Sequence, residues 1–272
     1  MHNVTMPPAP TPKPMTPSAA EVKALLFDFD GTLWDSESLI FTIYEEIFLA
    51  FGQALSHEVW WSFMGTIGFD AWARLEALAA TPIDRLTADL QVNRRKDELL
   101  SQATARPGVK RYLADADALG LRRAIVSNSS GPRIARYARQ CGVGDGWHAV
   151  QAAEGDRSRA KPNPDLYSAA LAMLGVRADE AVAFEDCACG VSAAKAAGLR
   201  CVAVPNPVTD RSALGAADLV LESFEQMSLS GVLAALGLNA CGDVLARSPR
   251  IHGGYAAASV GSALLAAPQD GA

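Results

Sequence analysis

Two aspartates one residue apart follow an apolar run near the start of the chain. Residues 25–33 read LLFDFDGTL, which predicts a buried strand that ends at Asp28 and Asp30. Because side chains alternate along a strand, the two carboxylates can face one site while Phe29 packs away from it. Carboxylates this close repel each other unless a cation or a shared proton relieves them. The pair therefore predicts a site that binds a cation or holds a proton.

Acidic side chains recur at the end of a second apolar run. Residues 181–184 predict another buried strand, and Glu185 and Asp186 follow it directly. Together with Asp28, these carboxylates would form an oxygen-rich site. Mg²⁺ commonly binds to a few protein carboxylates together with water and phosphate. The sequence therefore predicts Mg²⁺ as a cofactor.

Groups that can bind an anion lie in two other loops. Ser127 and Asn128 stand between a predicted strand and a predicted helix, where backbone N–H groups and the helix dipole favour negative charge. The same two residues could instead only cap the helix. Lys161 lies in a loop braced by prolines, which fix the backbone, so its ammonium could stabilise charge on a transferred group. A lysine in such a loop could also be merely solvated.

The elements that position these residues alternate along most of the chain. Predicted helices span residues 109–119, 132–140, 165–174 and 191–197. Predicted strands span residues 122–127, 147–152, 181–184, 201–204 and 219–221. Such alternation predicts an α/β fold, a Rossmann-like, doubly wound parallel sheet with helices on both faces. Ligands of such sheets bind beyond the carboxyl ends of the strands, where the polar residues above are expected.

One long segment carries no strand signal. Predicted helices within it span residues 37–51, 58–64, 70–79 and 82–103, the last with Pro82 in its first turn. We interpret residues 37–105 as an α-helical cap inserted after strand one of a core formed by residues 21–36 and 106–236. The proline-rich residues 1–20 predict a disordered tail. Residues 237–272, rich in Gly, Ala and Ser, predict a weakly structured tail.

Composition limits the classes of function. The chain has 272 residues, of which half are hydrophobic, and this suffices for one large core with an insert. Its net charge of −6 argues against nucleic-acid binding, which favours a basic face. No apolar run is long enough to span a membrane, and the five cysteines lack metal-ligand spacing. We expect a cytoplasmic monomer or homodimer with no nucleic-acid or membrane partner.

The four polar segments together resemble the motifs of a known family. They are Asp28-Phe29-Asp30-Gly31-Thr32, Ser127-Asn128, Lys161-Pro162-Asn163-Pro164-Asp165, and Glu185-Asp186 with Gly190 after three further residues. In this order and context they resemble the four motifs of the haloacid dehalogenase (HAD) superfamily. The similarity covers about residues 22–236. It is greatest to subfamily IA, whose members carry a helical cap and include β-phosphoglucomutase-like and phosphoglycolate phosphatase-like enzymes.

This resemblance implies a role for each residue of the core motifs. Asp28 would be the nucleophile that forms an aspartyl-phosphate, and Asp30 would protonate the leaving alcohol and then activate water. Lys161 would neutralise charge between the nucleophile and the phosphate. Residues expected to hold the phosphate are Ser127, Asn128, Gly31 and Thr32. Residues expected to hold Mg²⁺ are Asp28, Asp30 through its backbone carbonyl, Glu185 and Asp186.

The resemblance also implies an activity, a Mg²⁺-dependent phosphatase acting on a small phosphorylated metabolite. A phosphosugar mutase and a non-catalytic protein with the same fold are the alternatives. The mutases carry a histidine twelve residues after the nucleophile, where this chain has Ile40, and an arginine in the cap, where residues 65–68 read GTIG. Both differences favour hydrolysis, and the complete motif set argues against a non-catalytic protein. Polar cap residues expected to contact the substrate are Glu37, Thr66 and Arg74.

Overall fold

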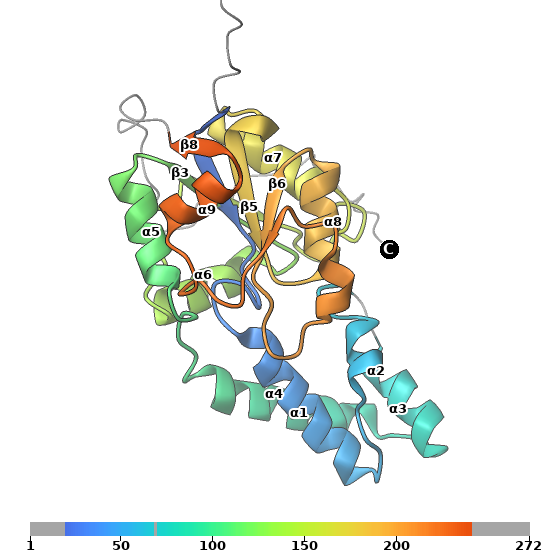
Figure 1. Ribbon diagram of the computed structural model, residues 1–272. Coiled ribbons are helices and arrows are strands. Elements are labelled where there is room, and N and C mark those ends of the chain that lie inside the picture. The colour runs from blue at the N-terminus through green and yellow to red at the C-terminus, as the bar shows by residue number, and fades with distance from the viewer. Residues whose placement is uncertain (1–19, 68–69, 241–272) are drawn as a thin grey trace, which may run out of the picture.

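A parallel six-stranded sheet forms the centre of the protein in a computed structural model that describes residues 20–67 and 70–240 (Figure 1). Its strands, in spatial order, are β4 (Ala149–Ala152), β3 (Arg122–Ser127), β2 (Ala24–Phe27), β5 (Ala181–Glu185), β6 (Arg200–Ala203) and β7 (Leu219–Val220). Every neighbouring pair is parallel. This arrangement confirms the predicted α/β fold. Because β2 lies between β3 and β5, the acidic segment after β2 emerges in the middle of the sheet.

Helices cover both faces of this sheet. One face carries α5 (Val109–Ala118), α6 (Gly131–Gln140) and α9 (Leu229–Ala235). The other face carries α7 (Asp165–Leu174) and α8 (Ala188–Ala196). Alternate residues of β2 reach the two faces, since Leu25 and Phe27 pack with the first set of helices and Leu26 with the second. A strand buried on both sides reads as a continuous apolar run, as residues 24–27 do.

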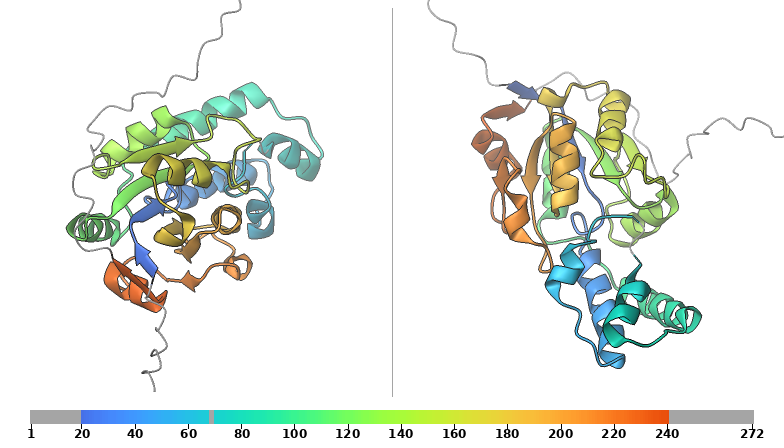
Figure 2. Two further views of the ribbon diagram at one scale, coloured as in Figure 1. Left: turned by 90° about the horizontal axis from the view of Figure 1, so that it is seen from above. Right: turned by 90° about the vertical axis from the view of Figure 1, so that its right-hand side faces the viewer.

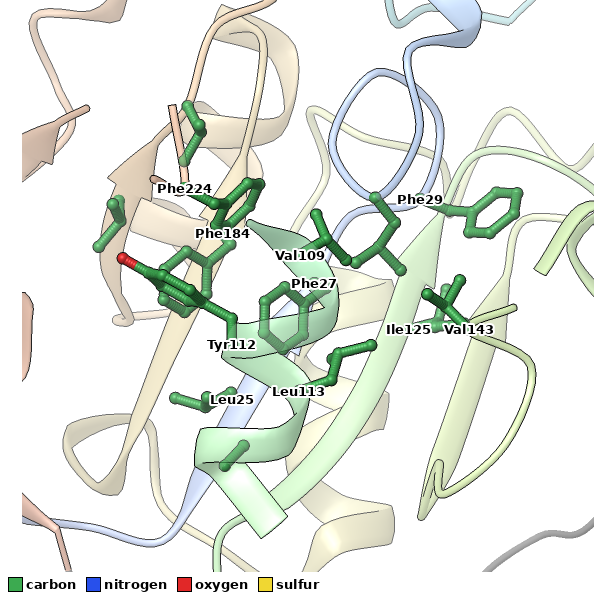
Figure 3. Packing of buried hydrophobic residues seen from close by; sticks show 14 of the residues in the cluster. Leu25, Phe27, Phe29, Val109, Tyr112, Leu113, Ile125, Val143, Phe184 and Phe224 are labelled. Carbon is green, nitrogen blue, oxygen red and sulfur yellow. The ribbon is translucent and has the colours of Figure 1, made fainter. Parts of the chain in front are cut away.

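Aromatic side chains fix β2 and β5 against each other. The ring of Phe27 stacks on that of Phe184 with their centroids 4.8 Å apart. Tyr112 of α5 meets the edge of the Phe184 ring at 5.8 Å, and Phe224 packs on Tyr112 at 5.0 Å (Figure 3). Each such pair contributes about 0.5–1.5 kcal/mol beyond the burial of its surface. The two strands that precede the acidic residues are therefore held rigidly.

Four further helices form a separate layer beyond the carboxyl ends of the strands (Figures 1 and 2). They are α1 (Ser36–Ala50), α2 (His57–Trp61), α3 (Ala71–Ala79) and α4 (Arg85–Leu100). We call this layer the helical insert. Most of a third hydrophobic cluster, including Ile43, Phe48 and Leu75, lies in this insert, and Cys187 and Val208 of the core pack into the same cluster. The insert lies in the segment predicted as the cap, and it faces the edge of the sheet where the acidic residues emerge (Figure 2).

The start of α4 differs from the prediction. The sequence placed Pro82 in the first turn, but the helix begins at Arg85. Asp84 is the N-cap residue, and its carboxylate accepts a hydrogen bond from the backbone N–H of Thr87 at 3.2 Å. An aspartate at this position satisfies an N–H group that has no partner within the helix, which stabilises the start three residues later.

The C-terminal part of the core also differs from the prediction. The region from residue 237 was expected to be weakly structured, but Leu238–Ala240 form β8, which pairs in parallel with β1 (Ala20–Val22). Leu238 is buried in the core because this pairing covers it. The helix α9, just before it, was not predicted. Residues 1–19 and 241–272 of the two predicted tails lie outside the described residues.

Short 3-10 helices complete the core, at Ala178–Glu180 and Arg211–Leu214. Within residues 20–67 and 70–240, no helix combines the length and apolarity needed to cross a membrane.

Candidate active site

The two aspartates of the opening motif lie in a tight loop directly after β2. The backbone N–H of Asp28 donates to the carbonyl of Phe184 at 2.9 Å and so extends the strand pairing by one residue. Phe29 is fully buried, as predicted, while Asp28 and Asp30 both line a cavity of about 280 Å³. Gly31 has a φ of +82°, and a Cβ atom there would lie 2.0 Å from a carboxylate oxygen of Asp186. Only glycine therefore permits this turn and this approach.

Lys161 joins the two acidic strand ends. Its Nζ donates to Asp28 Oδ1 at 2.5 Å, to Glu185 Oε1 at 2.7 Å and to the carbonyl of Val126 at 2.7 Å. Burial alone would lower the pKa of Lys161, but the carboxylates of Asp28 and Glu185 raise it, so the ammonium stays charged. Lys161 is thus a fixed buried cation rather than a solvated loop residue.

Negative charge remains in excess around Lys161. Burial raises the pKa of Asp28 to about 7, although the Lys161 ammonium opposes this shift. Burial also raises the pKa of Asp186 well above its ordinary value, and the nearby charges of Asp28 and Glu37 add to the effect. Two buried carboxyl groups that resist ionisation next to a charged lysine indicate that a positive charge would stabilise this site further.

Several oxygens of the site fit a divalent cation. Glu185 Oε1 binds Lys161 and the hydroxyl of Tyr167, but the fully buried Oε2 has no hydrogen-bond partner among the described residues. The side chain of Asp186 lies beside it, together with Cys187, and one ligand atom of each lies within 4.8 Å of the others. Carboxylate oxygens suit hard ions such as Mg²⁺, whereas a thiolate suits softer metals. The oxygen donors here fit Mg²⁺.

Asp30 lies in a different electrostatic environment from Asp28. Its carboxylate accepts hydrogen bonds from Ser129 Oγ at 2.5 Å and from Arg133 Nη2 at 2.9 Å. Burial alone would raise the pKa of Asp30, but the Arg133 guanidinium and the Ser129 hydroxyl hold it below its ordinary value. The two aspartates therefore have pKa values shifted in opposite directions, which is typical of residues with different catalytic tasks.

The sequence prediction missed Ser129, Arg133, Tyr167 and Asn206 as parts of this site. Asn206 donates from Nδ2 to Asp186 Oδ2 at 2.7 Å and so orients that carboxylate. Arg133 could have been considered, because it lies in the first turn of the helix that follows the Ser127 loop. Nothing in the sequence near Tyr167 or Asn206 indicates that they reach the acidic strand end.

The residues predicted to hold phosphate divide into two groups. Ser127 and Asn128 line the cavity. Gly31 donates its N–H to the carbonyl of Trp34 at 2.9 Å, and Thr32 is fully buried, with no partner for its hydroxyl among the described residues. Neither Gly31 nor Thr32 lines the cavity wall.

The side chain of Asn128 is fully engaged by protein groups. Its Oδ1 accepts from the backbone N–H of Lys161 at 2.8 Å, and its Nδ2 donates to the carbonyl of Lys161 at 3.2 Å. The same Nδ2 donates to the carbonyl of Gly65 in the helical insert at 2.9 Å. Asn128 thus holds the lysine loop and the insert together, and only its backbone N–H is left to face an anion.

Two further contacts hold the helical insert over the cavity. Cys189 Sγ donates to the carbonyl of Gly65 at 3.4 Å, and Trp61 Nε1 donates to the carbonyl of Val208 at 2.9 Å. A Cβ atom on Gly65, whose φ is +74°, would lie 2.7 Å from Cys187 Sγ. The insert can therefore approach the core this closely only because residue 65 is glycine.

The predicted substrate-binding residues of the insert occupy different places. Glu37 and Thr66 line the cavity, and Lys96 of α4, which the sequence prediction missed, lines it as well. Burial raises the pKa of Glu37 to about 8, and the charges of Asp30 and Asp28 contribute to the shift. Arg74 lies on the exposed side of α3 and is not among the cavity residues. Gly68, where the mutases carry arginine, lies outside the described residues.

Comparison with known proteins gives a consistent result. A family model described as "Hydrolase: haloacid dehalogenase-like hydrolase" matches residues 22–198. YhcW of Bacillus subtilis (strain 168) is 37% identical over 213 residues, covering 78% of this chain and 96% of that protein. Hexitol phosphatase A of Escherichia coli (strain K12) is 32% identical over 213 residues, covering 76% and 94%.

A solved structure is also similar. CbbY from Rhodobacter sphaeroides, in complex with xylulose-(1,5)bisphosphate, superposes with a TM-score of 0.60 at 30% identity. The match covers 77% of this chain and 98% of that one.

Proposed function

The chain belongs to the haloacid dehalogenase-like hydrolase family and is a phosphoric monoester hydrolase, and we propose how it performs this reaction. In our proposal it hydrolyses a small phosphorylated metabolite with Mg²⁺ through an aspartyl-phosphate at Asp28. The single observation that carries the proposal is the pair of aspartates after β2, one bound to Lys161 and the other to Arg133. Similarity to a hexitol phosphatase and to a protein with a bound sugar bisphosphate supports a phosphorylated sugar or polyol as the substrate.

In the first step, a carboxylate oxygen of Asp28 attacks phosphorus, and the bond from phosphorus to the leaving oxygen breaks. Lys161, already bound to Asp28, neutralises charge on the phosphoryl oxygens, and Ser127 orients them. Asp30 gives a proton to the leaving oxygen. For this it must first carry a proton, so the substrate has to weaken the contact between Asp30 and Arg133.

In the second step, water attacks phosphorus and releases inorganic phosphate, which restores the carboxylate of Asp28. Asp30 takes the proton from this water. Its pKa, held low by Arg133 and Ser129, keeps it ionised in the arrangement described here. That is the protonation state in which it can act as a base.

The metal would be held by Asp28, by the backbone carbonyl of Asp30, by Glu185 and by Asp186. The unpartnered Glu185 Oε2 and the raised pKa values of Asp28 and Asp186 support this assignment. Bound Mg²⁺ would supply positive charge to the phosphoryl oxygens and would favour the ionised form of Asp28.

The helical insert would act as the cap that excludes bulk water during the reaction. The contacts of Gly65 with Asn128 and Cys189 support a closed position over the cavity. Glu37, whose pKa is about 8, would be protonated at neutral pH and could donate a hydrogen bond to a substrate hydroxyl. Thr66 lies at the same wall, whereas Arg74 would contact substrate only after a movement of the insert.

We further propose that the protein acts in the cytoplasm, as a monomer or homodimer. Within the described part of the chain, Cys141, Cys187, Cys189 and Cys201 are free thiols, which supports a reducing compartment.

A panel of phosphomonoesters assayed with and without Mg²⁺ tests this function. We expect inorganic phosphate to be released from at least one sugar or polyol phosphate, and EDTA to abolish the release. Phosphorus NMR of a sugar 1-phosphate separates hydrolysis from the mutase alternative. Isomerisation without free phosphate would show that the enzyme is a mutase.

A second prediction concerns pH and metal together. The folded state binds protons to Asp28 and Glu37 up to about pH 7 and 8, whereas the unfolded chain releases them near pH 4. The folded state therefore holds more protons in this interval, and raising the pH destabilises it. In EDTA we expect the midpoint temperature of thermal unfolding to decrease as the pH is raised from about 5 to about 8. Mg²⁺ should raise it more at pH 8 than at pH 5, because the metal binds ionised carboxylates.

Scanning calorimetry measures both effects, and the Glu37→Gln variant is the control. This variant cannot titrate at residue 37, so its midpoint should depend less on pH than that of the wild type. A midpoint that rises from pH 5 to 8 in EDTA, or that does not respond to Mg²⁺, would contradict the assignment of the metal site.

A further inference from the structure

Lys96 differs from the other basic residues that line the cavity. It lies in α4 of the helical insert and is half-buried. Its Nζ lies 5.8 Å from the centre of the Tyr44 ring, and it forms no ion pair with a carboxylate in the part of the chain that is described. On the same helix, Arg94 pairs with Glu98 and Arg95 with Glu46. Among the described residues, the Lys96 ammonium at the cavity thus lacks the carboxylate partner that Arg94 and Arg95 have.

The other two cations of the cavity are already paired. Lys161 binds Asp28 and Glu185 on the core side, and Arg133 binds Asp30. Arg133 is also held over the rings of Trp34 and Tyr137, at 5.7 and 5.0 Å. Its hydrogen bond to Asp30 uses Nη2, and its other guanidinium nitrogens have no hydrogen-bond partner among the described residues.

Lys96 and Arg133 repel each other across the cavity. Burial lowers the pKa of Lys96, and the charge of Arg133 lowers it further, while the charge of Asp89 raises it by a smaller amount. A half-buried ammonium next to another cation is unfavourable unless an anion lies near both. Asp89 forms no ion pair with Lys96 and does not line the cavity, and none of the described carboxylates of the cavity pairs with Lys96. An anion close to both cations would therefore come from the ligand.

We propose that Lys96, together with Arg133, binds a second anionic group on the substrate, a phosphate or a carboxylate remote from the phosphoryl group that is transferred. This inference rests on the proposed function, because it takes the reacting phosphoryl group to lie at Asp28. That group is bound by residues of the core, Lys161 and Ser127, whereas Lys96 belongs to the insert on the other wall. Lys96 is then a specificity-determining residue that favours substrates with two separate anionic groups, which we call doubly anionic substrates.

Matched substrate pairs test the inference. In the first pair, fructose 1,6-bisphosphate carries one phosphate more than fructose 1-phosphate. In the second pair, 3-phosphoglycerate carries a carboxylate that glycerol 3-phosphate lacks. We expect the wild type to show a kcat/KM about 10- to 100-fold higher for the doubly anionic member of at least one pair, the range of a charge-assisted hydrogen bond. The pair that responds identifies whether the second group is a phosphate or a carboxylate.

Lys96→Met is the test variant, and Arg94→Gln on the exposed side of the same helix is the control. Lys96→Met should remove the preference, because it should lower kcat/KM far more for the compound with two anionic groups than for the compound with one. Arg94→Gln should keep the preference. The inference is wrong if the wild type shows no preference in either pair, or if Lys96→Met reduces both members of a pair equally.

Binding measured without turnover separates this inference from the proposed function. Calorimetry of the full chain in EDTA gives the Kd of each compound for wild type and Lys96→Met. A preference for the doubly anionic compound that Lys96→Met abolishes supports the subsite even if no phosphate is released in the Mg²⁺ assay. Phosphate release from these compounds with equal Kd values in each pair overturns the subsite and leaves the phosphatase function intact.

Discussion

Asp28→Asn is expected to reduce phosphate release by about 10⁴-fold or more, the scale on which loss of an attacking group reduces enzymatic rates. An amide is a far weaker nucleophile than a carboxylate, and no other carboxylate in the described cavity has the same contact with Lys161 and the same position directly after β2. The measurement is kcat at saturating Mg²⁺ for the best substrate of the panel.

The fold should survive this substitution. Burial makes ionisation of Asp28 unfavourable, as its pKa of about 7 shows, so a neutral group of the same shape is tolerated. We expect a thermal midpoint in EDTA at pH 8 equal to or above that of the wild type. Asp145→Asn, which changes an exposed carboxylate that does not line the cavity, should keep full activity. Substantial turnover by Asp28→Asn would exclude Asp28 as the nucleophile.

Lys161→Met is expected to lose activity and about 3–5 kcal/mol of unfolding free energy, the cost of removing one partner from a buried ion pair. The Lys161 ammonium is almost completely buried and lies within 2.7 Å of carboxylate oxygens of Asp28 and Glu185. Without it, the two carboxylates remain close together with no compensating charge. Urea unfolding monitored by circular dichroism measures the loss.

Lys195→Met provides the matched control for this experiment. Lys195 pairs with Asp218 at 2.7 Å, but about a third of each side chain is exposed. A partly exposed pair of this kind contributes about 1 kcal/mol or less, so this variant should unfold close to the wild type and remain active. Equal destabilisation by the two variants would contradict the role of Lys161 as the buried charge that organises the site.

The proximity of the polar residues at the strand ends could be predicted from local sequence pattern. An apolar run predicts a strand, and parallel strands bring their carboxyl ends to one edge of a sheet. Asp28, Ser127 and Glu185 each follow such a run, so their proximity followed from short segments read independently. The alternation of these segments with amphipathic helices was sufficient for the fold class as well.

Contacts between segments far apart in the sequence could not be predicted in this way. Pairing of β1 with β8 joins residues near the two ends of the described chain, and no local pattern marks either as the partner of the other. Arg133 and Ser129 bind Asp30 across about a hundred residues. Asn128 has the residue type of a phosphate ligand, yet its side chain binds Gly65 and the lysine loop.

By itself, the sequence determined the α/β fold, the helical insert and the set of carboxylates, lysine and serine at the strand ends, because each follows from residue type and periodicity over a few residues. Only the tertiary structure decided how those groups differ. Burial raises the pKa of Asp28, and Arg133 lowers that of Asp30, although the two carboxyl groups are chemically identical and one residue apart. Such differences arise from desolvation and from charges brought near by packing, and neither is encoded in the spacing of the motif.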